Sequence, residues 1–315
     1  MLCQEAESTL LGYTPPMPVF THTVPDDPPM LRLDAYCAKA FPVFTSRNQA
    51  RKAIKEKRLL VDGEPARTDW FPKAGMEMAA TVPESPVLPL LKIEMDVLYQ
   101  DPHLAVVFKP AGIQTRGNCR RTVHRALRYN MEMSTEPDAL PMPDPCHRLD
   151  YKTSGLLIVA RTVSCRVEIN RMFAARQINK RYRALVAGRL DGEGEIDTPL
   201  DERTCLSRWR AVEHTQSLHV DWFTTVELEP VTGRTHQLRR HMAGIDHAIL
   251  GDDMYTRDGK LLRRQGLFLA ALHLDFIHPM TGEPVVVDAP EPRKFTVLRE
   301  REARRWERHH SDTVR

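Results

Sequence analysis

Apolar and polar positions follow two patterns along this chain, and each pattern predicts a different kind of element. Short apolar runs predict strands over 97–99, 104–108 and 156–160, and alternation predicts another strand over 182–187. Further strands are expected over 220–228, 267–276 and 285–288, with one longer helix over about 163–176. Many strands with few long helices predict an α+β domain built on a mixed or antiparallel sheet.

Residues 31–80 show helical spacing instead. An apolar period of three to four residues runs from Leu33 to Phe41 and predicts a first helix. Ser46 can cap a second helix, and Gln49 three residues later completes a capping box. Asp62-Gly63 then follows a short apolar run, which is a hairpin signal. This segment is therefore expected to form a small α+β module of its own.

The second predicted helix is apolar on one side and cationic on the other. Arg47, Arg51, Lys55 and Arg58 fall at offsets of zero, four, eight and eleven, which places them on one face. Unpaired like charges at this spacing cost stability. The face therefore suggests contact with phosphate groups, and the alternative is an ordinary solvated surface.

Three short features of this module resemble the S4 RNA-binding domain. They are Arg32-Leu33-Asp34 at the first helix, Ser46-Arg47 at the second, and the hairpin Leu60-Val61-Asp62-Gly63-Glu64. The resemblance implies a small RNA-binding domain over 30–81. It also implies that the cationic face binds substrate RNA through Arg47, Arg51, Lys55 and Arg58.

Composition sets limits on the class of protein. A length of 315 residues allows about two domains, and the net charge of +3 does not by itself imply a polyanionic partner. The six cysteines are widely spaced, which fits neither a zinc site nor a disulfide framework and favours a reducing compartment. No signal peptide and no apolar run of about 20 residues is evident, so we expect a cytoplasmic protein without a membrane partner.

Proline-rich stretches mark the expected boundaries. Residues 1–29 are interpreted as an extended arm, with a disordered tail as the alternative, and 82–92 as a linker. A larger catalytic domain is expected over 93–292. Residues 293–315 are rich in arginine and predict a basic C-terminal helix or tail, for which a solvated helix and extra RNA contact are both open.

Three polar segments carry the candidate chemistry. They are His147-Arg148-Leu149-Asp150 before the apolar run at 156–160, Lys180-Arg181-Tyr182, and Gly233-Arg234-Thr235-His236-Gln237-Leu238-Arg239. A polar loop that leads into a buried strand can hold a carboxylate at the edge of a core, where its charge is strongly felt. Thr235 can cap a short helix in the third segment.

Other kinds of site have little support. His236 and His241 lack the i,i+4 spacing of a helical zinc pair, so no metal is expected. Glycine-rich phosphate loops and the G-x-S-x-G elbow are both missing from the sequence, so no nucleotide cofactor is expected either.

The three segments closely resemble, in order, the motifs of the RluA-type pseudouridine synthases. Gly251-Asp252 and His273 to Pro279 resemble the closing segments of that family. The resemblance implies that Asp150 is the catalytic aspartate, acting by covalent attack or by removal of the C2′ proton. It implies that Tyr182 stacks on the target base, that Arg239 pairs with Asp150, and that Arg148 fills the gap left by the flipped uridine.

The resemblance also implies a substrate and the needs of the reaction. Uridine isomerisation is redox-neutral and keeps every atom, so no cofactor is required. The expected partner is RNA, with large-subunit rRNA first and tRNA second, and the enzyme is expected to be a monomer. Two alternatives stay open: a non-catalytic RNA-binding protein of ribosome assembly, and a glycosidase, which needs a second acid near Asp150.

Overall fold

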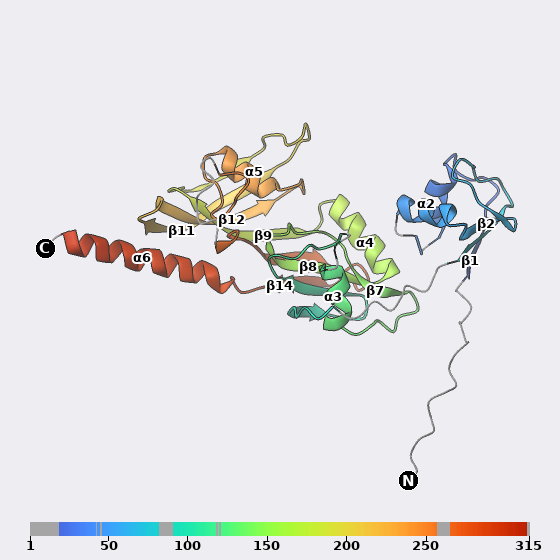
Figure 1. Ribbon diagram of the computed structural model, residues 1–315, viewed down its shortest axis with the longest axis horizontal. Coiled ribbons are helices and arrows are strands. Elements are labelled where there is room, and N and C mark those ends of the chain that lie inside the picture. The colour runs from blue at the N-terminus through green and yellow to red at the C-terminus, as the bar shows by residue number, and fades with distance from the viewer. Residues whose placement is uncertain are drawn as a thin grey trace, which may run out of the picture. The chain divides into compact units, whose positions relative to one another are not determined.

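The structure is a computed structural model of the chain, shown in Figure 1, and it describes residues 19–41, 43–44, 46–81, 91–117, 119, 121–256 and 265–313. The chain divides into two compact units, Met1–Pro89 and Leu90–Arg315. Most of the predicted arm, 1–18, and most of the predicted linker, 82–90, lie outside the described residues.

The first unit packs two helices on a four-stranded sheet of order β1-β4-β2-β3. Its elements are β1 (Val19–Thr23), α1 (Leu33–Ala40), α2 (Arg47–Lys55), β2 (Leu59–Val61), β3 (Glu64–Pro65) and β4 (Glu77–Thr81). The predicted cap is confirmed, because the Ser46 side chain accepts a hydrogen bond from the Gln49 amide at 3.3 Å. The predicted hairpin is confirmed as well, with positive φ at both Asp62 and Gly63.

The prediction of an arm is wrong for Val19–Thr23. These residues form strand β1, which pairs antiparallel with β4 from Val19 opposite Thr81 to Thr23 opposite Glu77. The strand is mostly exposed on its side-chain faces, so it lacks the apolar alternation that would have revealed it. Its stability comes from main-chain pairing with a partner more than fifty residues away in sequence.

The second unit is built on a sheet of ten strands, with the path β10-β11-β12-β9-β13-β8-β6-β5 and with β14 on β13 and β7 on β8. The strands are β5 (Val97–Gln100), β6 (Leu104–Lys109), β7 (Ala139–Pro145), β8 (Ser154–Thr162), β9 (Asn179–Ala187), β10 (Glu193–Ile196), β11 (Ser207–Ser217), β12 (Asp221–Pro230), β13 (Leu269–Ile277) and β14 (Pro284–Asp288). Eight of the nine pairings in this sheet are antiparallel, and the α+β class predicted from the sequence is confirmed. The sequence patterns did not predict β7, β10 or β11.

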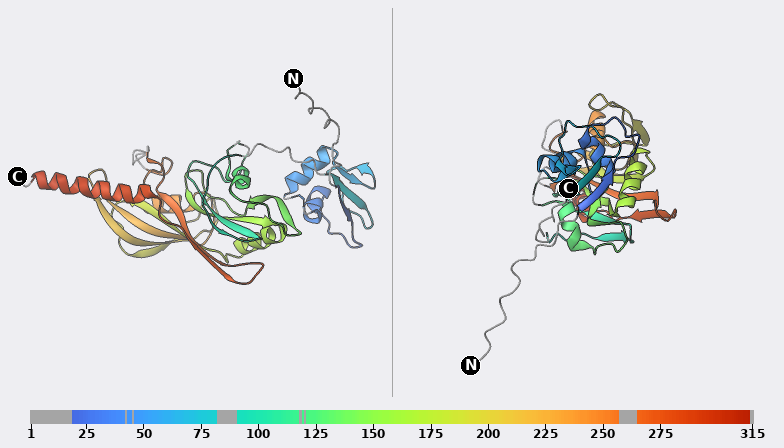
Figure 2. Two further views of the ribbon diagram at one scale, coloured as in Figure 1. Left: turned by 90° about the horizontal axis from the view of Figure 1, so that it is seen from below. Right: turned by 90° about the vertical axis from the view of Figure 1, so that its right-hand side faces the viewer.

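Four helices complete this unit: α3 (Val123–Asn130), α4 (Val163–Ala174), α5 (Gln237–Gly244) and α6 (Arg293–Thr313). Helices α3 and α4 cover the end of the sheet that contains β7 and β8, and α5 lies on the β11–β12 end (Figure 1). Helix α6 runs along β11 (Figure 2). The prediction of a helix in 293–315 is confirmed for Arg293–Thr313. The start of α6 belongs to the core, because Phe295 and Leu298 are fully buried against Phe268, so the alternative of a tail does not apply to this part.

The two ends of the sheet meet at a narrow parallel contact between β8 and β13. Only two pairs form it, Ser154 with Ala270 and Gly155 with Ala271. Gly155 has a φ of +126°, and a Cβ at this position would lie 2.1 Å from the carbonyl oxygen of Ala271. Glycine is therefore required here, and it lets the loop before β8 approach the second half of the sheet.

Candidate active site

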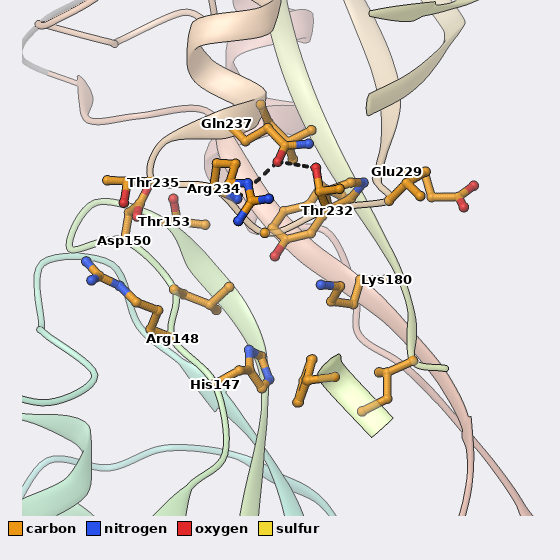
Figure 3. Close-up of a pocket in the computed structure, with 18 of the residues that line it drawn as sticks. His147, Arg148, Asp150, Thr153, Lys180, Glu229, Thr232, Arg234, Thr235 and Gln237 are labelled. Atoms are coloured by element: carbon orange, nitrogen blue, oxygen red, sulfur yellow. Dashed lines mark hydrogen bonds between the residues drawn. The ribbon is translucent and has the colours of Figure 1, made fainter. Parts of the chain in front are cut away.

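A cleft of about 730 Å³ opens beside this contact (Figure 3). All three polar segments identified in the sequence line it. Asp150 comes from the loop before β8, Tyr182 from β9 and Arg239 from α5. The fold thus brings together residues that are up to 89 positions apart in the chain.

Main-chain contacts on both sides hold the loop that carries Asp150. The Leu149 amide donates to the Thr115 hydroxyl and that hydroxyl donates to the Leu149 carbonyl, both at 3.2 Å. The amide of Gly112 donates to the carbonyl of Tyr151 at 2.7 Å. The Asp150 side chain itself is 19% exposed, so it is fixed at its base and open toward the cleft.

Arg239 is buried beside Asp150, but its main partner is a different carboxylate. Its Nε and Nη2 donate to the two oxygens of Asp252 at 2.6 and 2.8 Å, whereas its Nη1 lies 3.8 Å from Oδ2 of Asp150. The predicted pairing with Asp150 is therefore looser than expected. Burial alone would lower the pKa of Arg239, but the hydrogen bonds and charge of Asp252 raise it, so the guanidinium stays charged.

The loop that presents Asp252 requires glycine at position 251. Gly251 has a φ of +76°, and a Cβ there would lie 1.9 Å from the carbonyl oxygen of Gly266. Asp252 also accepts hydrogen bonds from the amides of Met254 and Tyr255. The sequence pointed to Gly251-Asp252 only as a matching segment, and no local pattern indicated that Asp252 holds Arg239.

His236 is a second residue whose place the sequence did not predict. Its Nε2 lies 3.8 Å from Oδ2 of Asp150, and its Nδ1 lies 2.9 Å from the Tyr255 hydroxyl. It occupies the N-cap of α5 in a left-handed conformation, with φ at 54° and no capping hydrogen bond from its side chain. The prediction that Thr235 caps this helix is therefore wrong.

Gln237 fixes the start of α5 in place of a capping side chain. Its Oε1 accepts hydrogen bonds from the Thr232 hydroxyl at 2.7 Å and the Arg234 amide at 3.0 Å (Figure 3). Its Nε2 donates to the Leu206 carbonyl at 2.9 Å. This network ties the third polar segment to β11, so Arg239 and His236 are presented from a rigid base.

Tyr182 lies in the cleft between the two halves of the sheet, packed on both neighbouring core clusters. Burial, and then the charge of Asp150, raises the pKa of the Tyr182 phenol. The hydroxyl therefore stays protonated at neutral pH. An aromatic ring held in this way beside a carboxylate can serve as a platform for a nucleobase.

Lys109 lies beneath the same loop and is fully buried. Its ammonium donates to the carbonyls of Pro110 and Ile113 at 3.0 and 2.9 Å. Burial lowers its pKa to about 8, even though the charge of Asp150 acts in the opposite direction. At neutral pH the ammonium of Lys109 therefore adds a buried positive charge near Asp150.

Of the four cationic residues predicted on the second helix, Arg47, Arg51 and Lys55 lie on α2. Arg58 lies beyond the end of α2 at Lys55, so the prediction that it continues the helical face is wrong. Three of the four residues have acidic partners. The side chain of Asp34 is 1% exposed, and its Oδ2 lies 3.0 Å from Nε of Arg47 and 3.0 Å from Nε of Arg51. Arg58 donates to Glu56, and Lys55 is exposed without an ion-pair partner among the described residues. The interpretation of this face as unpaired is therefore wrong for the arginines.

Asp34 explains why the helix tolerates its arginines. Burial would raise the pKa of the Asp34 carboxyl, but the hydrogen bonds from Arg47 and Arg51 outweigh this and lower it. The two arginines hold α2 against α1 while their side chains remain 49% and 43% exposed.

Two negative findings apply to the described part of the chain. No group of three or more His, Cys, Asp or Glu side chains there is placed to hold a metal ion. Within the same ranges, every helix is too short or too polar to cross a membrane.

Comparisons with family models and with individual relatives agree on the class of protein that contains this cleft. The model described as RNA pseudouridylate synthase matches residues 103–244, and the S4 domain model matches residues 31–77. The ribosomal large subunit pseudouridine synthase D of Xanthomonas campestris is 33% identical over 89% of this chain and 93% of its own. The dual-specificity RNA pseudouridine synthase RluA of Haemophilus influenzae is 34% identical over 64% of this chain and 95% of its own.

A solved structure shows the same fold. Human RNA pseudouridylate synthase domain containing 1 is 26% identical and superimposes with a TM-score of 0.53 over 63% of this chain and 84% of its own. The chain belongs to the RNA pseudouridine synthase family, carries an S4 domain, and is an RNA-modifying isomerase. The glycosidase alternative is therefore wrong.

Proposed function

We propose that Asp150 starts the isomerisation of uridine to pseudouridine, with Tyr182 and Arg239 as its partners. The observation that carries the proposal is that Arg239 has two acidic neighbours, Asp252 in direct hydrogen-bond contact and Asp150 at a longer distance. Asp252 holds the guanidinium, so Asp150 gains a nearby positive charge but keeps its carboxylate open to the cleft. Both routes that are chemically open to Asp150, attack on the sugar and removal of the C2′ proton, need such an ionised and accessible carboxylate.

The reaction in this site proceeds by cleavage, rotation and reattachment. The N1–C1′ bond of uridine breaks, the uracil turns, and a C5–C1′ bond forms. The C5 proton is then lost and N1 gains a proton, so the product keeps every atom of the substrate. The target base must leave its helix or loop first, which costs a few kcal/mol. We infer that stacking on Tyr182 contributes about 1–3 kcal/mol toward that cost. Arg148 is exposed and lines the cleft near Asp150 (Figure 3), and we infer that its side chain fills the gap.

The proposed substrate is large-subunit ribosomal RNA, with tRNA as the second candidate. The Xanthomonas relative, which matches nearly the whole chain, is named for the ribosomal large subunit. The dual-specificity relative matches a smaller share of this chain. A second class of RNA substrate is therefore retained, and we propose tRNA as that second candidate. We propose further that the enzyme acts in the cytoplasm as a monomer, and that Arg47, Arg51, Lys55 and Arg58 of the S4 domain contact RNA phosphates.

Pseudouridine mapping tests the substrate directly. Unmodified transcripts of large-subunit rRNA and a pool of unmodified tRNA transcripts are incubated separately with the wild-type enzyme and with Asp150→Asn, and pseudouridines are mapped in each. We expect one or a few uridines of the rRNA to be converted by the wild type only. Conversion confined to tRNA would overturn the choice of rRNA, and equal conversion by Asp150→Asn would overturn the role of Asp150.

A further inference from the structure

The end of the cleft away from Asp150 carries cations that the reaction described above does not use. Lys180 lies on β9 two residues before Tyr182, and its ammonium points into the cleft opposite Arg148 and Asp150 (Figure 3). Arg176 and Arg234 are further cations in the lining of the cleft. The cleft, at about 730 Å³, has room for more of the RNA than a single extruded base, and these cations line it.

These three cations lack carboxylate partners in the part of the chain that the structure describes. Arg234 donates only to the carbonyl of Thr204, and Lys180 contacts the Phe173 ring, with its Nζ 5.4 Å from the ring centroid. Glu229, which with Asp150 is one of two acidic residues in the lining of the cleft, is paired with Arg208 at 3.4 Å. Many other arginines of this unit face an acid, as Arg208 and Arg210 do on the neighbouring strand β11, whereas these three cations of the cleft do not.

The surroundings of Lys180 hold its side chain in place without neutralising it. The rings of Phe173 and His147 pack in a tilted arrangement, with 4.8 Å between their centroids. The Nε2 of His147 accepts a hydrogen bond from the Ile158 amide at 3.0 Å, and burial lowers the His147 pKa to about 3, so this ring is neutral. Lys180 therefore packs against uncharged aromatic rings, and burial lowers the pKa of Lys180 as well. A partly desolvated ammonium without a counter-ion is a site for an oxyanion.

We propose that the Lys180 end of the cleft is a phosphate subsite that binds the RNA backbone next to the flipped uridine. Lys180 is the central ligand, and Arg176 and Arg234 extend the site along the strand. The proposal rests on the active-site assignment above and deepens it. A backbone phosphate bound to Lys180 would hold the RNA strand while the flipped base lies on Tyr182. The two side chains can act together because they lie only two residues apart on β9.

The test uses a short stem-loop that contains the uridine identified by mapping, whichever RNA that proves to be. A methylphosphonate, which lacks the phosphate charge, replaces the linkage immediately 5′ or immediately 3′ of that uridine. Wild type, Lys180→Gln and Lys180→Arg are compared for KM, kcat and RNA affinity. Arg171→Gln is the matched control, because Arg171 is an exposed arginine of α4 paired with Glu168.

We expect Lys180→Gln to raise KM about tenfold with kcat nearly unchanged and to reduce the salt slope of binding by about 0.7–0.9. Lys180→Arg restores most of the affinity. One of the two methylphosphonates should weaken the wild type about tenfold and have no further effect on Lys180→Gln. The subsite would be overturned if each methylphosphonate weakened Lys180→Gln as much as it weakens the wild type, or if Lys180→Gln lowered kcat at unchanged RNA affinity. Because the wild type is active on the stem-loop used, neither result could be explained by a wrong choice of RNA.

Discussion

Each unit of this enzyme places a carboxylate beside arginine, and the two arrangements differ in what the carboxylate can still do. Asp34 in the S4 domain is 1% exposed and takes direct hydrogen bonds from Arg47 and Arg51. Asp150 in the catalytic unit is 19% exposed and meets Arg239 only at 3.8 Å. The first carboxylate is buried and holds both arginines on its Oδ2, whereas the second stays open to the cleft, as its proposed role requires.

The difference comes from Asp252. This residue, with a side chain that is 1% exposed, binds Arg239 with both oxygens and keeps it from closing on Asp150. The guanidinium therefore supplies charge without blocking the carboxylate. In the proposed mechanism, an arginine that is held by another acid is thus the feature that separates the reactive Asp150 from the structural Asp34, and each prediction below tests that distinction.

Apart from replacement of Asp150 itself, the largest effect is expected from Asp252→Asn. Breaking a buried ion pair by removing one partner costs about 3–5 kcal/mol, and the freed Arg239 can close on Asp150. We expect the single-turnover rate at saturating RNA to fall about 10²-fold, together with a marked loss of thermal stability. Asp253→Asn is the control, because Asp253 is an exposed neighbour paired with Lys152. A rate within threefold of wild type would contradict the proposed role of Asp252.

Asp34→Asn should affect stability alone. It leaves Arg47 and Arg51 without their shared acid, so we expect a loss of about 3 kcal/mol in the S4 domain, read from faster hydrogen exchange of the α1 and α2 amides in the intact chain. The single-turnover rate at saturating RNA should not change, because the chemistry lies in the other unit. Asp69→Asn, in an exposed pair with Arg67, should leave the exchange rates unchanged.

Lys109 gives a prediction about pH. Its pKa in the fold is about 8, below the ordinary 10.5, so between these values the unfolded chain holds a proton that the fold has lost. The Lys109 contribution to the free energy of unfolding therefore rises with pH in this window, by at most about 1.4 kcal/mol per pH unit. Denaturant titrations of wild type and Lys109→Met from pH 7 to 10 should show this extra rise in the wild type only.

The smallest effect is expected at Lys55. Because Arg47 and Arg51 also hold Asp34, replacing them would mix loss of stability with loss of RNA contact, whereas Lys55 is exposed and has no ion-pair partner among the described residues. Lys55→Gln should weaken RNA binding a few-fold and lower the salt slope by about 0.7–0.9. Lys73→Gln, a charge-matched change in the loop before β4, serves as control. An unchanged slope for Lys55→Gln would count against phosphate contact at this position.

Much of the fold could be predicted from local patterns. The buried run at Leu156–Ala160 became β8, the capped amphipathic segment became α2, and Asp62-Gly63 formed the expected turn. Strand β1 could not be predicted, because its residues gain their stability from pairing with β4 and show no apolar face.

The site could be predicted only as far as its motifs extend. Asp150, Tyr182 and Arg239 were each identified from their segments, and all three line one cleft. The bonds from Arg239 to Asp252 and from Arg47 to Asp34 join residues 13 positions apart that meet only after folding. The left-handed conformation of His236 also has no sequence signal, because histidine rarely adopts it.

The most direct measurement is the single-turnover rate of Asp150→Asn on the mapped RNA, made beside its equilibrium affinity for the same RNA. Asparagine keeps the shape of the side chain and removes its charge. The account predicts a rate at least about 10³-fold below wild type with affinity within threefold. A variant that binds normally and still converts uridine at more than a tenth of the wild-type rate would contradict the claim that the free carboxylate of Asp150 starts the reaction.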